Sequence, residues 1–154
     1  MVHLIKELAV TRQKEIARLE NICNVLREHI MSIYYWRDYD CVNHWEGEIF
    51  GLIPVMRTLK GSKKTLSEKV IYENLFLDWS RNFHLVADTY IERLMDKETN
   101  LPRITNMDID NIYNFLDEFY KIISHELAIN NTVRKPVLYT TIETLLKKYP
   151  YKII

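Results

Sequence analysis

Apolar residues recur in this chain at steps of three and four, and this spacing restricts the possible folds more than any other feature. In the first segment the apolar positions keep these steps, with Arg12 as the one gap. Such steps place residues on one side of an α-helix, so the pattern predicts a helix from about residue 4 to 35. Its apolar stripe consists of Ala9, Ile16, Leu19, Cys23, Leu26, Ile30 and Ile33.

Four further stripes predict helices over residues 43–59, 66–97, 107–129 and 136–148. Asn43 and Glu46 form a capping signature for the second helix, and Pro54 inside it predicts a kink or a restart. Thr65-Leu66-Ser67-Glu68 is a capping box for the third helix. Asn106 is expected to begin the fourth helix and Pro136 the fifth.

Each of these stripes must be buried against the others, and a helical bundle achieves this with short connections. The sequence therefore predicts an all-α bundle of four to five helices in a single domain over residues 1–154. The long helices are expected to be antiparallel and amphipathic, and the C-terminal one is shorter. With 154 residues, only three glycines and four prolines, the chain excludes a turn-rich all-β fold.

Charge and cysteine content limit the possible partners and compartments. Twenty-one basic residues balance 21 acidic ones, so no overall field draws the chain to nucleic acid or to an anionic membrane. No run approaches the roughly 18 apolar residues of a membrane span, and the N-terminus lacks the apolar core of a signal peptide. Two cysteines, Cys23 and Cys41, are no disulfide framework, so we expect reduced thiols in a cytoplasmic protein.

Two histidines have a carboxylate four residues later, in the pairs His44–Glu48 and His84–Asp88. Residues four apart share a helix face, so each pair could offer two metal ligands. The stretch 43–54, with His44-x-x-x-Glu48 before an apolar run and a proline, resembles the hemerythrin-like family. That resemblance implies a four-helix bundle with a non-haem di-iron centre. Its candidate ligands would be His44, Glu48, His84 and Asp88, with His29 and His125 completing the shell.

The helix phase argues against this metal site. A metal in a bundle core needs ligands that project inward. At about 100° per residue, His44 points away from the stripe that contains Trp45 and Ile49. His84 and His125 are also displaced from the core face. We therefore expect exposed histidines and no cofactor, and the metal-binding bundle is an alternative interpretation.

Basic residues gather in two segments and suggest a second alternative. If both segments met on one face, they could neutralise phosphates and bind nucleic acid. They could equally be solvated ends that are matched by acidic residues within the fold. The candidates for nucleic-acid contact are Lys60, Lys63, Lys64, Lys147 and Lys148.

An aromatic segment, Tyr34 to Asp40, joins the first two predicted helices. Tyrosine, tryptophan and arginine contribute most of the binding energy at many protein interfaces. Tyr35, Trp36, Arg37 and Tyr39 are therefore the candidate partner-binding residues, although they could instead pack over the helix junction. Residues 26–59 also resemble in outline the opening of poxvirus Bcl-2-like regulators, which bind partners. The central helix rich in small residues is missing here.

Catalytic motifs are missing from the sequence. Neither a nucleophile elbow nor a phosphate loop occurs, and Cys23 falls on an apolar stripe. Acidic neighbours are expected to raise the pKa of Cys41 and make its thiol unreactive. The sequence therefore favours a non-enzymatic helical module that acts through protein–protein interaction, in regulation or assembly. Its partner would be another protein or a second copy of the chain, and no membrane is involved.

Overall fold

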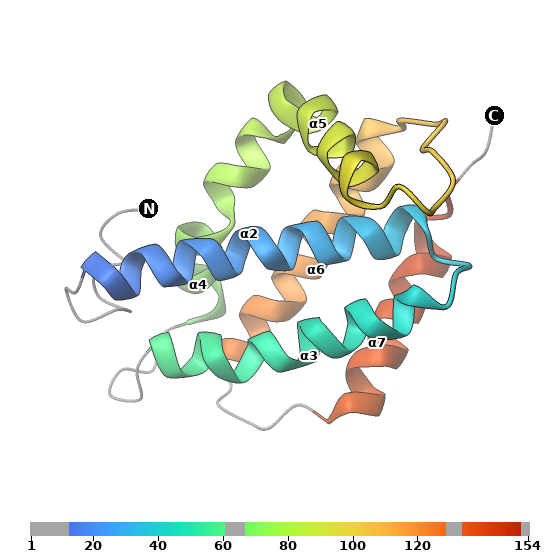
Figure 1. Ribbon diagram of the computed structural model, residues 1–154. Coiled ribbons are helices and arrows are strands. Elements are labelled where there is room, and N and C mark those ends of the chain that lie inside the picture. Colours follow the sequence, from blue (N-terminus) through green and yellow to red (C-terminus); the bar gives the residue numbers. More distant parts are fainter. Residues whose placement is uncertain (1–12, 61–66, 129–133, 152–154) are drawn as a thin grey trace.

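The computed structural model describes residues 13–60, 67–128 and 134–151, and the side chains of these except 13–16, 58–60 and 74. Within these ranges the chain forms six helices and no strand (Figure 1). The predicted all-α fold is confirmed. The helices are α2 (Gln13–Tyr35), α3 (Cys41–Lys60), α4 (Glu68–Leu75), α5 (Leu77–Lys97), α6 (Ile109–Ala128) and α7 (Lys135–Lys148).

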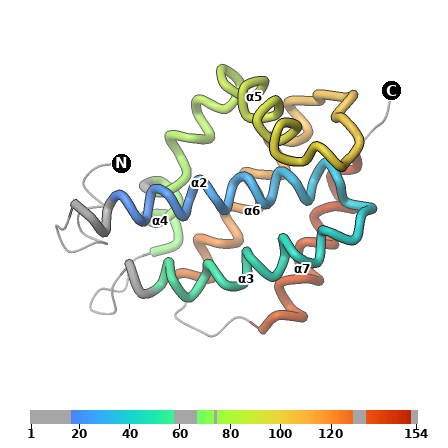
Figure 2. Tube along the Cα trace, in the orientation of Figure 1, coloured from blue at the N-terminus to red at the C-terminus, as the bar shows by residue number. Residues whose placement is uncertain are grey.

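Helix α6 lies at the centre of the described structure. It contacts each of the other five helices. α2 and α3 run side by side in opposite directions, and α6 passes behind them (Figure 1). In the same view α5 lies on the other side of α2 from α3 (Figure 2). The buried residues of α6 are Ile112, Phe115, Leu116, Phe119, Tyr120, Ile123, Ser124 and Leu127.

Two features of α3 differ from the sequence-based predictions. The helix begins at Cys41, two residues before the predicted cap at Asn43. Glu46 is therefore not a capping residue, and its side chain is buried. The helix also continues through Pro54 to Lys60, so the predicted restart does not occur.

The third predicted helix is two helices. α4 ends and α5 begins at Phe76, whose φ of −123° and ψ of −22° depart from helical values. Ser67 caps α4, because its hydroxyl accepts the N–H of Val70 at 3.2 Å. Thr65, the first residue of the predicted capping box, lies outside the described residues.

The starts of α6 and α7 were predicted to within a few residues. The Asp108 carboxylate accepts the N–H of Asn111 at 3.1 Å and caps α6, whereas the predicted cap Asn106 is buried. α7 begins at Lys135 with Pro136 in its first turn, as predicted. For the N-terminal helix, the predicted residues 4–12 lie outside the described chain. No helix of the described chain combines the length and the apolar character needed to cross a membrane.

Candidate functional site

Two of the predicted partner-binding aromatics, Tyr35 and Trp36, lie inside the helix junction. Trp36 is buried, and its indole N–H donates a hydrogen bond to the carbonyl of Pro102 at 2.8 Å. Its ring also packs on Trp45, and Tyr35 is buried beside it. This burial corrects the expectation that Tyr35 and Trp36 are exposed together. It matches the other interpretation of the segment, in which the aromatics pack over the junction.

Arg37 connects the same junction to the C-terminal helix. Its guanidinium donates hydrogen bonds to the carbonyls of Tyr34 at 3.0 Å, Leu146 at 2.7 Å and Tyr149 at 2.9 Å. These bonds occupy the donor groups that a partner would need. Of the four predicted residues, only Tyr39 is exposed, with 44% of its surface accessible. The segment therefore joins α2 to α7.

The predicted metal ligands do not come together. His44 and Glu48 form an exposed pair at 3.6 Å. His84 lies 2.9 Å from the carboxylate of Asp110 and is not paired with Asp88. Among the residues that the structure describes, no group of three or more histidine, cysteine, aspartate or glutamate side chains could hold a metal ion.

The other two candidate histidines, His29 and His125, have other contacts. The ring Nδ1 of His29 lies 2.8 Å from the carbonyl oxygen of Val25, on its own helix. His125 lies 3.0 Å from the carboxylate of Glu68 and joins α6 to the start of α4. Neither contact involves His44 or His84.

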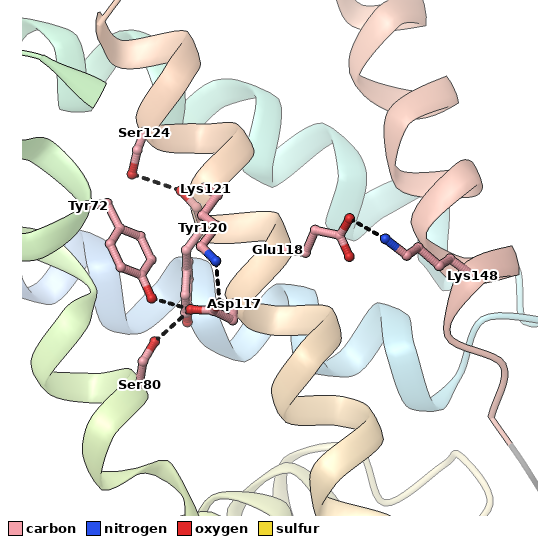
Figure 3. Close-up of polar contacts among 8 residues, drawn as sticks. All are labelled: Tyr72, Ser80, Asp117, Glu118, Tyr120, Lys121, Ser124 and Lys148. Atoms are coloured by element: carbon pink, nitrogen blue, oxygen red, sulfur yellow. Dashed lines mark hydrogen bonds and ion pairs between the residues drawn. The ribbon is translucent and has the colours of Figure 1, made fainter. Parts of the chain in front are cut away.

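The C-terminal lysines of the nucleic-acid hypothesis pair with carboxylates. Lys147 lies 3.5 Å from Glu143 on its own helix. Lys148 lies 2.8 Å from Glu118 on α6, so this lysine joins α7 to the central helix (Figure 3). The side chain of Lys60 and all of Lys63 and Lys64 lie outside the described residues.

A different site lies between α2 and the α4–α5 pair. Here the structure encloses a pocket with a volume of about 360 Å³. Pockets of this size are typical of binding sites for small ligands or single anchoring side chains. Its apolar lining comes from three parts of the chain: Leu19 and Cys23 on α2, Leu75, Phe76 and Val86 around α4 and α5, and Tyr120 on α6.

Three polar or amphipathic side chains give this pocket its chemistry. The guanidinium carbon of Arg27 lies 4.1 Å from the ring centre of Tyr90 and 5.6 Å from that of Trp79. Only 7% of the Arg27 surface is accessible. Cation–π contacts of this kind stabilise a charged guanidinium away from water. The exposed residues at the rim are Glu20, Asn24, Asp78 and Asn82.

The Cys23 thiol and the Tyr120 hydroxyl in the pocket stay protonated at neutral pH. Burial raises the pKa of the Cys23 thiol to about 12, more than the nearby Arg27 charge lowers it. Burial also raises the pKa of the Tyr120 hydroxyl well above its usual value. A thiol that stays protonated is a poor nucleophile. The arrangement therefore fits binding better than covalent catalysis.

A polar network holds the pocket walls against α6 (Figure 3). The hydroxyls of Tyr72 on α4 and Ser80 on α5 both donate hydrogen bonds to the carboxylate of Asp117. Lys121 forms an ion pair with the same carboxylate at 3.0 Å. Burial, and then the bond to Asp117, raises the pKa of Tyr72 to about 12, so its hydroxyl remains a donor. The network fixes α4 and α5 relative to the central helix.

The spacing of apolar residues in the sequence does not predict this pocket. Trp79 and Tyr90 lie at apolar positions spaced by three and four residues in the helix predicted over residues 66–97, and such a stripe is expected to be buried in the core. Arg27 received no role, although it lies four residues after Cys23 and thus on the same side of α2. A charged residue this close to an apolar stripe was the one feature of the sequence that could have indicated the pocket.

Comparison of the chain with protein-family models, with curated proteins and with solved structures finds no match. The functional conclusion therefore depends on the geometry of this chain alone.

Proposed function

We propose that this chain is a non-enzymatic helical module that acts through protein–protein interaction, and that the pocket between α2 and α4–α5 is its binding site. One observation carries the proposal: Arg27, Trp79 and Tyr90 meet in a partly open cavity. These are the residue types that contribute most to binding energy at protein interfaces. The apolar lining and the polar rim follow the usual anatomy of an interface.

The partner is another protein or a second copy of this chain, and the role is regulatory or in assembly. We also propose a cytoplasmic location. Cys23 and Cys41 are both free thiols, and a reducing compartment maintains this state.

The test compares two tryptophan substitutions in the full-length chain. Val86→Trp adds a large side chain at the pocket wall, whereas Val137→Trp adds the same side chain at an exposed position of α7. Both variants and the wild type are purified with a tag from the native cell, and co-eluting proteins are quantified by mass spectrometry. We expect a stoichiometric partner with wild type and Val137→Trp, and at least about a tenfold loss with Val86→Trp, equivalent to 1.4 kcal/mol.

Equal recovery of the partner with Val86→Trp would show that the pocket is not the binding site. A monomeric wild type without any co-eluting protein would contradict the interaction proposal itself. Two cheap measurements on the same samples address the alternatives. A raised ratio of absorbance at 260 and 280 nm together with salt-sensitive binding would indicate nucleic acid. Elemental analysis of protein purified without chelator would reveal a bound metal.

A further inference from the structure

The pocket contains two buried hydrogen-bond donors without acceptors. In the described structure, Nε of Arg27 and the indole Nε1 of Trp79 are buried and have no hydrogen-bond partner. Both side chains line the pocket. An unpaired buried polar group costs free energy, and a buried charge costs more than a neutral group. A ligand that brings an acceptor to this place would recover that cost.

Arg37 shows how this chain satisfies an arginine that has only a structural role. Its guanidinium donates to carbonyls of Tyr34, Leu146 and Tyr149. No hydrogen bond or ion pair of Arg27 with another described residue exists; its contacts are the faces of Tyr90 and Trp79. Cation–π contacts use no N–H donor, and Nε has no acceptor in the described structure, so the guanidinium still has N–H groups to donate. A planar guanidinium with free N–H groups is suited to a carboxylate, which it can bind through two parallel bonds.

The surroundings of Arg27 restrict the acceptor further. Glu20 and Asp78 are exposed and line the pocket, so its rim carries two carboxylates. A phosphate group or a run of acidic residues would be repelled by them. A single carboxylate on an otherwise apolar body is compatible with both the rim and the apolar lining.

We infer that the pocket binds the C-terminal carboxylate of a partner chain whose last residue is large and apolar. At a chain terminus the carboxylate and the side chain are attached to the same carbon, so one residue supplies both groups within a cavity of about 360 Å³. The carboxylate accepts hydrogen bonds from Arg27 and Trp79, and the side chain lies against Phe76 and Val86. This inference rests on the proposed function, because it takes the ligand to be part of a partner protein.

The test uses two small probes with the same body. N-acetylphenylalanine has the free carboxylate, and N-acetylphenylalaninamide lacks it. Both are titrated into full-length, ¹⁵N-labelled protein, and the three tryptophan indole N–H signals are followed by NMR. The Trp79 signal reports on the pocket. The Trp36 signal is an internal control, because its N–H is already bonded to the carbonyl of Pro102.

We expect the acid to bind at least tenfold more tightly than the amide and to shift the Trp79 signal but not the Trp36 signal. Arg27→Gln should reduce the affinity for the acid to that for the amide. Arg18→Gln, which removes an exposed arginine from the same helix, should leave it unchanged. Equal affinities of acid and amide, or an undiminished preference in Arg27→Gln, would overturn the inference.

The result can be separated from the test of the proposed function. If Val86→Trp removes the protein partner but the acid has no advantage over the amide, the interaction proposal holds and the carboxylate inference fails. If the acid is preferred but Val86→Trp leaves the partner bound, the protein partner uses another surface. The inference in its stated form then fails too, and the pocket is a site for a small organic acid.

Discussion

The buried Arg27 and the partly buried Arg37 have opposite energetic roles in this structure. Arg37 forms three hydrogen bonds to backbone carbonyls, whereas Arg27 is stabilised only by aromatic faces within the described residues. Breaking the bonds of Arg37 leaves carbonyls without donors, but removing Arg27 leaves no described polar group without its partner. Replacing buried charges with apolar side chains of similar volume is often neutral or stabilising.

Arg27→Met should therefore raise the free energy of unfolding, by about 1 kcal/mol once the lost cation–π contacts are subtracted. Urea denaturation at pH 7 measures the change. Arg18→Met is the matched control at an exposed position of α2, and we expect a change within about 0.5 kcal/mol for it. A loss of stability in Arg27→Met would show that Arg27 is needed for the fold rather than for a ligand.

Glu46 on α3 gives a prediction about pH. Its side chain is buried, and burial raises its pKa, with a smaller contribution from the Glu143 carboxylate. The folded protein therefore binds a proton more readily than the unfolded chain. The contribution of Glu46 to stability is highest below the ordinary pKa of 4.5 and falls as the pH rises from there through its folded-state pKa.

Glu46→Gln should remove this loss, because the amide carries no charge at any pH in this range. We expect the variant to be more stable than wild type at pH 7 by about 1 kcal/mol, the usual cost of a poorly compensated buried polar group. Denaturation curves between pH 4.5 and 8 check this. Glu48→Gln, at an exposed position two residues later, should leave the wild-type dependence on pH unchanged. Identical pH profiles for Glu46→Gln and wild type would refute the assignment.

At the scale of helices, α3 contains two glycines that its packing does not require. A Cβ atom added at Gly51 would meet nothing within 4 Å, and one added at Gly47 would lie 3.8 Å from the hydroxyl of Tyr139, an ordinary contact. Glycine inside a helix costs about 0.5–1 kcal/mol relative to alanine. Neither packing nor space therefore explains why these positions are glycine.

Gly51→Ala should raise the free energy of unfolding by about 0.5–1 kcal/mol, mainly by restricting the unfolded chain. The midpoint of urea unfolding checks this, and the m-value should stay constant. Gly47→Ala serves as a second test of the same reasoning, and the two gains should add. If Gly51→Ala lowered stability, the helix at this position would need a conformation that alanine resists.

The spacing of apolar residues predicted the helices well but not their ends or breaks. The stripes follow from local geometry, so α3, α6 and α7 match predicted helices within a few residues, whereas α4 and α5 together span the single helix predicted over residues 66–97. The break at Phe76 was not predictable from spacing, because Phe76 continues the stripe from Tyr72 to Trp79. Its ring is stacked on Tyr120 of α6 at 4.4 Å, a tertiary contact that accompanies the change of direction between α4 and α5.

At the scale of the whole molecule, the candidate site is assembled from parts that are distant in sequence. Arg27 and Trp79 are 52 positions apart, and Tyr120 comes from a third segment. Periodicity assigns each of them to a helix face but does not show which faces meet. The same limit explains why spacing left open whether Trp36 is exposed or packs over the helix junction, since its acceptor is the carbonyl of Pro102.

Contacts between residues far apart in the sequence also hold α7 in place. Substitution of Arg37 tests how much these contacts contribute to stability. The Arg37 guanidinium is the group that bonds the end of α2 to the carbonyls of Leu146 and Tyr149 at the end of α7. Lysine keeps the positive charge but lacks the planar set of donors that reaches several carbonyls at once. Arg37→Lys should lower the free energy of unfolding by about 3 kcal/mol, because partly buried carbonyls lose charged donors.

Hydrogen exchange can locate this loss. Amide protons of α7 should exchange faster in Arg37→Lys, while those of α6 keep their protection until global unfolding, because the core of α6 does not depend on the junction. Arg103→Lys is the control, since this arginine is exposed between α5 and α6. Equal loss of protection in α6 and α7 would mean that α7 does not detach separately. In that case the chain would unfold as one cooperative unit, and Arg37 would stabilise the whole bundle rather than the attachment of one helix.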